Sequence, residues 1–142
     1  MTGYREYRYG AQDGLSLYYR DYGDPCGAAL PVLCLPGLTR NSNDFHKVGL
    51  RLSKVRRVIC PDYRGRGQSD YDTNAKSYQP TTYLNDIRHL LAITGIGRTI
   101  VIGTSLGGLL AMGMGAAIPT SLAGVVLNDI GPEVATSGLN NI

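Results

Sequence analysis

The sequence predicts an α/β fold in which a mostly parallel sheet carries helices on both faces and an antiparallel hairpin at one edge. Short, continuous apolar runs alternate along the chain with segments of helical periodicity. This alternation is typical of strands that are buried on both faces and joined by crossover helices. The N-terminal segment instead alternates polar and apolar residues on both sides of a turn signal, which predicts a hairpin. With 142 residues, the chain has room for one domain.

The hairpin and the first buried strand come first along the chain. Residues 5–9 and 15–20 alternate in polarity, and the turn signal Asp13-Gly14 separates them. Residues 31–35 form a continuous apolar run that ends at a proline-glycine pair. Such a run predicts a strand that is covered on both faces.

The following segments alternate between helix and strand. The spacing of Phe45, Val48 and Leu52 predicts a helix, and residues 58–61 predict the next buried strand. A second helix is expected from the capping residue Thr82 to a C-terminal stop at Gly95.

The third and fourth parallel strands flank one more helix. Residues 99–102 predict a buried strand, and residues 106–118 predict a helix that Pro119 closes. Residues 125–127 predict the last strand. Right-handed crossovers then give an open sheet with the N-terminal hairpin at one edge.

Composition and charge exclude several classes of function. The net charge is +3, and one cluster of basic residues is interpreted as a solvated helix face rather than a nucleic-acid site, comprising Lys47, Arg51, Lys54, Arg56 and Arg57. No apolar run is long enough for a membrane span, so no membrane partner is expected. Three cysteines without C-x-x-C spacing indicate buried thiols and a cytoplasmic location. No ligand-type cluster or phosphate-binding glycine loop is found, so no metal or organic cofactor is predicted.

The segment from Gly103 to Gly107, Gly-Thr-Ser-Leu-Gly, has the pattern of a serine nucleophile elbow. Ser105 follows a buried strand directly and precedes a helix, whose N-terminal amides carry partial positive charge. The flanking glycines remove side chains that would collide in so tight a turn. The alternative is an ordinary turn with a capping hydroxyl.

Two backbone N–H groups are candidates for an oxyanion hole. The loop after the strand at 31–35 contains Gly37, which allows the backbone to approach the serine. The N–H of Leu38 is the expected donor from this loop, paired with the N–H of Leu106. A simple proline-glycine turn is the alternative interpretation of this loop.

Four motifs in order resemble the α/β-hydrolase superfamily, at residues 35–40, 62–70, 103–108 and 127–132. The resemblance implies the α/β-hydrolase fold with a sheet of eight strands, of which this chain would supply the first six. Residues 1–142 would then be the N-terminal part of a single α/β-hydrolase domain, without the cap and the C-terminal strands. Members commonly begin the oxyanion loop with His-Gly, where this chain has Pro-Gly.

The catalytic triad is incomplete, because no histidine follows Ser105. In this fold the order is serine, acid, histidine, so the base is expected beyond residue 142 and the chain alone should show negligible turnover. His46 and His89 both precede the serine and are expected to serve packing or to face solvent. Asp129, at the end of the last strand, is a candidate for the acid; the alternative is a hydrogen-bonding loop residue.

The motifs favour a serine-dependent hydrolase that cleaves a small-molecule ester, lactone or related acyl bond through an acyl-enzyme. A serine at the elbow argues against the dehalogenase and epoxide-hydrolase branches, whereas hydrolysis of carbon–carbon bonds and cofactor-free perhydrolysis remain alternatives. A further alternative is a non-catalytic, ligand-binding or truncated relative. The last strand would leave an uncovered sheet edge, so self-association is expected there.

Overall fold

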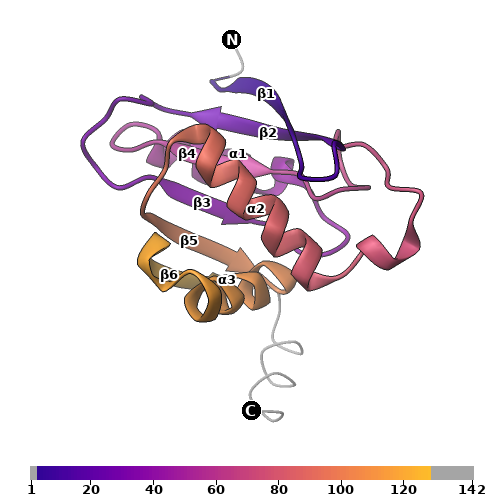
Figure 1. Cartoon of the computed structure of the whole chain (residues 1–142). Helices are drawn as coiled ribbons and strands as arrows, with labels where there is room; N and C mark the ends of the chain where they lie inside the picture. Colours follow the sequence, from indigo (N-terminus) through magenta and orange to yellow (C-terminus); the bar gives the residue numbers. More distant parts are fainter. Residues whose placement is uncertain (1–2, 129–142) are drawn as a thin grey trace.

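The computed structural model describes residues 3–128 and builds six strands into one sheet (Figure 1). Their order in the sheet is β1-β2-β4-β3-β5-β6. Strands β1 and β2 form an antiparallel hairpin, β2 pairs antiparallel with β4, and the remaining pairs are parallel. The predicted mixed sheet with a hairpin at its edge is confirmed. The strand bounds are Arg5–Gly10, Ser16–Tyr22, Val32–Leu35, Val58–Pro61, Thr99–Thr104 and Leu122–Asn128 for β1 to β6.

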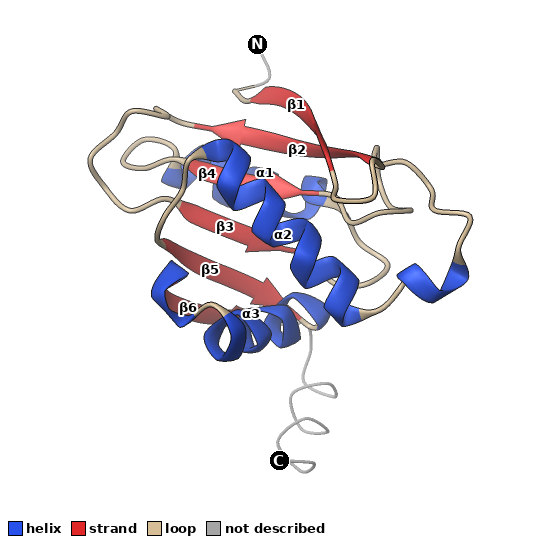
Figure 2. Cartoon of the chain, in the orientation of Figure 1, coloured by secondary structure: helices blue, strands red, loops and turns tan. Residues whose placement is uncertain are grey.

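Three α-helices cover the sheet on two faces, as predicted (Figure 2). Helices α2 (Pro80–Thr94) and α3 (Leu106–Ala117) pack on one face, and α1 (His46–Leu52) packs on the other. Among residues 3–128, no helix has the length and apolar character needed to cross a membrane. Three short 3₁₀ helices complete the described elements: η1 (Ser42–Phe45), η2 (Ala75–Ser77) and η3 (Pro119–Ser121).

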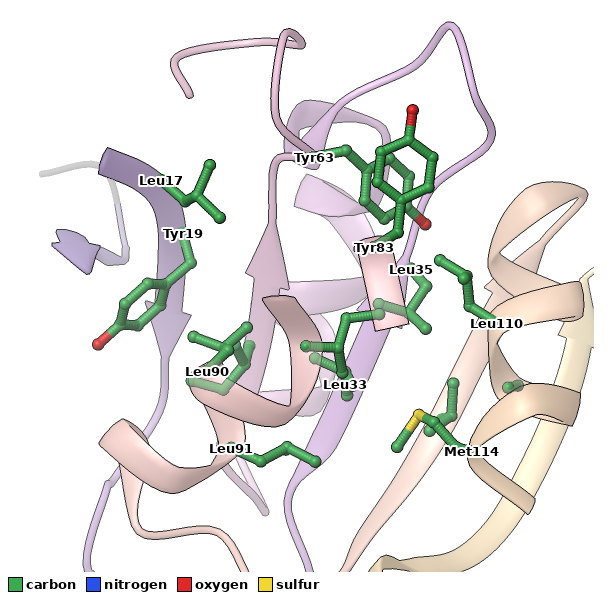
Figure 3. Close-up of a cluster of buried hydrophobic side chains, with 14 of the residues drawn as sticks. Leu17, Tyr19, Leu33, Leu35, Tyr63, Tyr83, Leu90, Leu91, Leu110 and Met114 are labelled. Carbon is green, nitrogen blue, oxygen red and sulfur yellow. The ribbon is translucent and has the colours of Figure 1, made fainter. Parts of the chain in front are cut away.

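The core consists of two layers because successive strand residues point to opposite faces. Leu33 and Leu35 of β3 belong to the larger cluster, together with residues of α2 and α3. Figure 3 shows these two side chains between Leu90 of α2 and Met114 of α3. The alternate residues of β3 pack instead with Phe45, at the end of η1. Full burial of each such leucine stabilises the fold by about 1.5–3 kcal/mol.

The helix ends differ in part from the sequence prediction. Helix α2 begins at Pro80, so Thr82 lies within its first turn and does not cap it. The fixed φ of proline suits the first helical position, which explains the earlier start. The C-terminal stop is confirmed, because Gly95 has a left-handed φ of 71° and its N–H donates to the carbonyls of Ala92 and Leu91.

The two cysteines that lie in strands are buried, as the sequence predicted. Cys34 of β3 and Cys60 of β4 are buried, and Cys26 is exposed in a loop. Burial, with a smaller contribution from Cys34, raises the pKa of the Cys60 thiol. A buried thiol with a raised pKa is a weak nucleophile, so Cys60 acts as a small apolar group of the core, and Cys34 is fully buried in the same cluster.

Candidate active site

Ser105 stands at the junction of β5 and α3 in a backbone conformation that side chains rarely adopt. Its φ of 54° and ψ of −111° resemble the first central position of a type II′ turn, which glycine usually occupies. Within residues 3–128 it is the one non-glycine residue with a positive φ. Such a conformation costs about 1–3 kcal/mol and persists only where the surrounding structure holds it. Strained conformations of this kind are found most often at functional sites, and Ser105 is exposed.

The glycines on either side of Ser105 make this turn sterically feasible. A Cβ atom on Gly103 would lie 2.6 Å from the carbonyl carbon of Gly107. A Cβ atom on Gly107 would overlap the carbonyl oxygen of Leu35 in the neighbouring strand β3. Both clashes involve backbone, which cannot move aside easily. The predicted steric role of the two glycines is therefore confirmed.

The loop after β3 lies directly against the serine. Strand β3 pairs with β5 so that Leu35 is opposite Gly103, which brings the ends of both strands to the same edge of the sheet. A Cβ atom on Gly37 would lie 3.7 Å from the Cβ atom of Ser105. A turn follows, in which the N–H of Arg40 donates to the carbonyl of Gly37 over 3.1 Å. Leu38 occupies this turn and lines the same cavity as Ser105.

Residues of the segment after β4 hold this loop in place. The Tyr63 hydroxyl donates to the carbonyl oxygen of Pro36 over 2.7 Å, and its ring stacks on Tyr83 of α2. The Asp62 carboxylate accepts hydrogen bonds from the backbone N–H of Ser42, at 2.6 Å, and of Gln68, at 3.0 Å. Asp62 thereby links η1 to the segment after β4. These contacts fix the position of the loop that faces Ser105.

Arg64, in the same segment, also has a structural role. Its buried guanidinium forms a bidentate pair with Asp86 of α2, at 2.8 and 2.6 Å. The same group binds Asp13 in the hairpin turn, at 2.7 Å, and Asp72, at 2.9 Å. Burial raises the pKa of Asp86, and Arg64 opposes this shift. Arg66 is different, because it is exposed and makes no side-chain hydrogen bond to another described residue.

A cavity of about 640 Å³ opens over Ser105. The ends of β3 and β5 form one side of it, and η1 and α1 form the other. Its volume is suited to a small organic molecule. The lining residues are Pro36, Gly37, Leu38, Thr39, Arg40, Asp44, Phe45, Val48, Thr104 and Ser105.

The wall of the cavity contains residues that sequence reasoning missed as site residues. Arg40 and Asp44 form an ion pair over 2.7 Å at its mouth, and the Asp44 carboxylate raises the pKa of the Arg40 guanidinium. Their spacing of four residues was a signal for pairing. The sequence did not indicate that η1 would turn this pair toward the serine.

The two histidines lie away from the serine, as predicted. His46 begins α1, and its Nδ1 atom is 2.8 Å from the hydroxyl oxygen of Tyr22. His89 is partly buried on α2. Neither side chain lines the cavity over Ser105. The candidate acid Asp129 lies outside the described residues, so its position relative to Ser105 stays a prediction.

Comparisons with known proteins agree with this geometry. The family model described as alpha/beta hydrolase fold matches residues 31–140. The chain is 36% identical over 124 residues to a 3-hydroxybutyrate-oligomer hydrolase from Cupriavidus necator, covering 87% of this chain and 42% of that protein. It is 32% identical over 114 residues to a 2-(acetamidomethylene)succinate hydrolase from Mesorhizobium japonicum, covering 80% and 40%.

Solved structures lead to the same family. An alpha/beta hydrolase from Novosphingobium aromaticivorans superposes with a TM-score of 0.85 at 48% sequence identity. The match covers 99% of this chain and 50% of that one. The chain thus spans half or less of the length of these relatives.

Proposed function

Because the chain belongs to the alpha/beta hydrolase fold family, we propose that Ser105 is the nucleophile of a serine hydrolase that cleaves an ester, lactone or related acyl bond. The observation that carries this proposal is the strained turn of Ser105 beneath a cavity of small-molecule size. Gly103 and Gly107 allow this turn to pack against its neighbours without collision and leave Ser105 exposed at the cavity.

The reaction follows from the groups around the serine. The Ser105 oxygen attacks the acyl carbon while a base removes the hydroxyl proton. The negative charge that develops on the acyl oxygen is stabilised by the backbone N–H groups of Leu38 and Leu106. The tetrahedral intermediate expels the alcohol, and water hydrolyses the acyl-enzyme. Removing one such donor typically lowers kcat by about 10²–10³-fold.

The base and the acid of the triad are proposed to lie outside the described residues. His46 is engaged with Tyr22, and His89 does not line the cavity, so neither is assigned as the base. Asp129 remains a candidate for the acid, and a loop residue with a structural role is the alternative. Without a positioned base, residues 1–142 by themselves are expected to show negligible ester turnover.

The names of the relatives support an acyl substrate of modest size. The relative from Cupriavidus necator is named for hydrolysis of 3-hydroxybutyrate oligomers, in which ester bonds join the units. We place the substrate of this chain among small hydroxy-acid or related esters on this basis. No metal or organic cofactor takes part in the proposed mechanism, because serine attack and two amide donors need none.

We also propose a cellular location, a domain organisation and a mode of self-association for the protein. A cytoplasmic location is supported by the three free thiols of Cys26, Cys34 and Cys60, since thiols persist in reducing compartments. We further propose that residues 1–142 form the N-terminal part of one catalytic domain. In the absence of a covering segment, the edge of β6 would support self-association.

Covalent labelling of Ser105 tests the proposed nucleophile. The purified chain is treated with a fluorophosphonate probe, and the modified residue is identified by mass spectrometry. Slow labelling of Ser105 is expected, and added imidazole should accelerate it by about tenfold because it supplies a base from solution. The variant Ser105→Ala should take up no label at this peptide.

A second serine provides the matched control. Ser53→Ala removes a hydroxyl that only donates to the carbonyl of Leu50, and its labelling should equal that of the wild type. Absence of label at Ser105 in the presence of imidazole would favour a ligand-binding protein without turnover and would overturn the proposal.

A further inference from the structure

We propose that Arg40 binds a carboxylate group of the substrate in the cavity over Ser105, which makes short acyl esters with a free carboxylate the preferred substrate class. The inference rests on the proposed function of Ser105, because it places the anionic end of the substrate relative to the acyl carbon that the serine attacks.

The first step of the argument is the position of Arg40. A Cβ atom built on Gly37 would lie 3.5 Å from the Cγ atom of Arg40 and 3.7 Å from the Cβ atom of Ser105. The side chains of Arg40 and Ser105 therefore both lie next to the backbone of Gly37. Three bonds separate Cγ from the guanidinium carbon of arginine, so the charged group can reach the cavity over Ser105 that Arg40 lines. A ligand in contact with both residues would be short.

The second step is the availability of hydrogen-bond donors. Arg40 uses Nε for its ion pair with Asp44, at 2.7 Å. Within residues 3–128, the two terminal nitrogens of its guanidinium have no hydrogen-bond partner. These nitrogens form the edge that binds a carboxylate in a bidentate manner. Asp44 holds the guanidinium at Nε and leaves this edge without a partner among residues 3–128, in a side chain that lines the cavity.

The third step is the charge balance of the site. Arg40 and Asp44 are the charged side chains that line the cavity over Ser105. Val48 also borders an adjoining hollow of about 340 Å³, whose lining contains the cations Lys47 and Arg51 and no acid. Within the cavity the charges of Arg40 and Asp44 balance, and Lys47 and Arg51 of α1 add positive charge beside it. This excess of positive charge favours an anionic ligand over a cationic or neutral one.

A purely structural role for Arg40 explains less. Its side chain is 64% exposed, and exposed ion pairs between residues four apart contribute little to folding. The turn of the loop is already closed by the backbone hydrogen bond from Arg40 to Gly37. The guanidinium can be replaced without loss of this bond, so its effect on ligand binding can be measured separately.

A binding experiment tests the inference independently of catalysis. The chain with Ser105→Ala is titrated with the linear ester dimer of 3-hydroxybutyrate, as the free acid and as its methyl ester, and Kd is measured by protein-observed NMR. The free acid should bind about fivefold more tightly than the methyl ester, a modest factor because the charged pair is partly solvated. High salt should reduce this preference.

Variants of Arg40 assign the preference to its side chain. Arg40→Gln should make the two Kd values equal, and Arg40→Lys should keep part of the difference because the charge remains while the planar donor edge is lost. Arg88→Gln, an exposed change on α2 away from the cavity lining, is the matched control and should keep the full preference.

Two results would overturn the inference: equal Kd values for acid and methyl ester in the Ser105→Ala chain, or a full preference that survives Arg40→Gln. Failure of both ligands to bind would also count against it. None of these results depends on the reactivity of Ser105, which the fluorophosphonate experiment reports. The two proposals can therefore fail separately.

Discussion

At the scale of single residues, Ser105 and its glycine neighbours show how a strained position is maintained. The serine keeps a positive φ because β5 and α3 are both anchored in the core on either side of it. Gly107 allows the first turn of α3 to approach the backbone of β3 at Leu35. Because the backbones of residues 107 and 35 lie so close together, any atom added at residue 107 should destabilise the turn.

Two glycines of α3 give a matched test of this sensitivity. Gly107→Ala should lower the free energy of unfolding by about 2–3 kcal/mol, because the new methyl group collides with the carbonyl of Leu35. Gly113→Ala should be neutral or raise it by up to about 1 kcal/mol, because its methyl group makes an ordinary contact with Leu84 at 3.5 Å and alanine favours the helix. Urea unfolding of both variants measures the difference, and equal effects would contradict the proposed packing.

At the scale of elements, Arg64 joins three segments that are distant in sequence. It links the turn of the β1–β2 hairpin at Asp13 to the loop that contains Asp72 and to Asp86 of α2. Removing one partner of such a buried group is costly because the remaining charge stays in a poorly solvated place. Asp13 is the most exposed member of the cluster, so its contribution can be measured without unfolding the protein.

The pH dependence of the free energy of unfolding should report the ion pair between Asp13 and Arg64. Its hydrogen bond with Arg64 lowers the pKa of Asp13 below the ordinary 3.8, so the folded state binds this proton less tightly than the unfolded state. The stabilisation is therefore complete above that value and is lost as pH falls through the lowered pKa. Asp13→Asn should reduce the free energy of unfolding by about 0.5–1 kcal/mol near neutral pH, a value limited by the 50% exposure of the side chain.

The difference between wild type and Asp13→Asn should vanish in strong acid, and unfolding in urea at a series of pH values measures it. Asp24→Asn is a suitable control. The carboxylates of Asp13 and Asp24 each accept a hydrogen bond from the backbone N–H two residues later, and an asparagine side chain can accept the same bond. Asp13 also forms an ion pair with Arg64, whereas Asp24 has no ion pair among the described residues. If Asp24→Asn lowers the free energy of unfolding as much as Asp13→Asn does, the ion pair with Arg64 is not the cause of the lost stability.

At the scale of the whole molecule, the sheet formed by residues 3–128 ends in a strand with exposed apolar side chains. Val126 and Leu127 of β6 are 52% and 63% exposed. Leu127 faces α3, because a Cβ atom on Gly108 would lie 3.3 Å from its Cδ2 atom. Val126 points to the opposite face, on which α1 packs against the middle of the sheet. An edge strand with such side chains is a template for pairing with another chain.

A charge on this edge should reduce self-association of the chain. Sedimentation velocity over a range of concentrations is expected to show association of the wild type, and Val126→Lys should shift the distribution toward monomer because pairing would bury the ammonium group. Val55→Lys changes a residue that is 67% exposed in the loop after α1, and it should leave association unchanged. A wild-type chain that stays monomeric at all concentrations would contradict the expectation.

Local patterns account for most of the fold. The apolar run of β3, the turn signal of the hairpin and the C-terminal Gly95 were recognisable because each reports the geometry of its own segment. The N-cap of α2 was misplaced by three residues, because it is Gln79 and not Thr82, and the proline at position 80 suits the first helical position. The steric role of the glycines around Ser105 was also anticipated, although only the contact of Gly103 is local, whereas that of Gly107 is with Leu35 of β3.

The sequence by itself determined the order of the strands and helices, the position of Ser105 at a strand–helix junction and the need for glycine at position 103. These features depend on contacts between near neighbours, which periodicity and residue type report directly. Only the tertiary structure decided that Arg64 would meet three carboxylates and that Arg40 would face the cavity over the serine. Such contacts join segments that are far apart in the chain, and the register between them is set by the packing of the whole sheet.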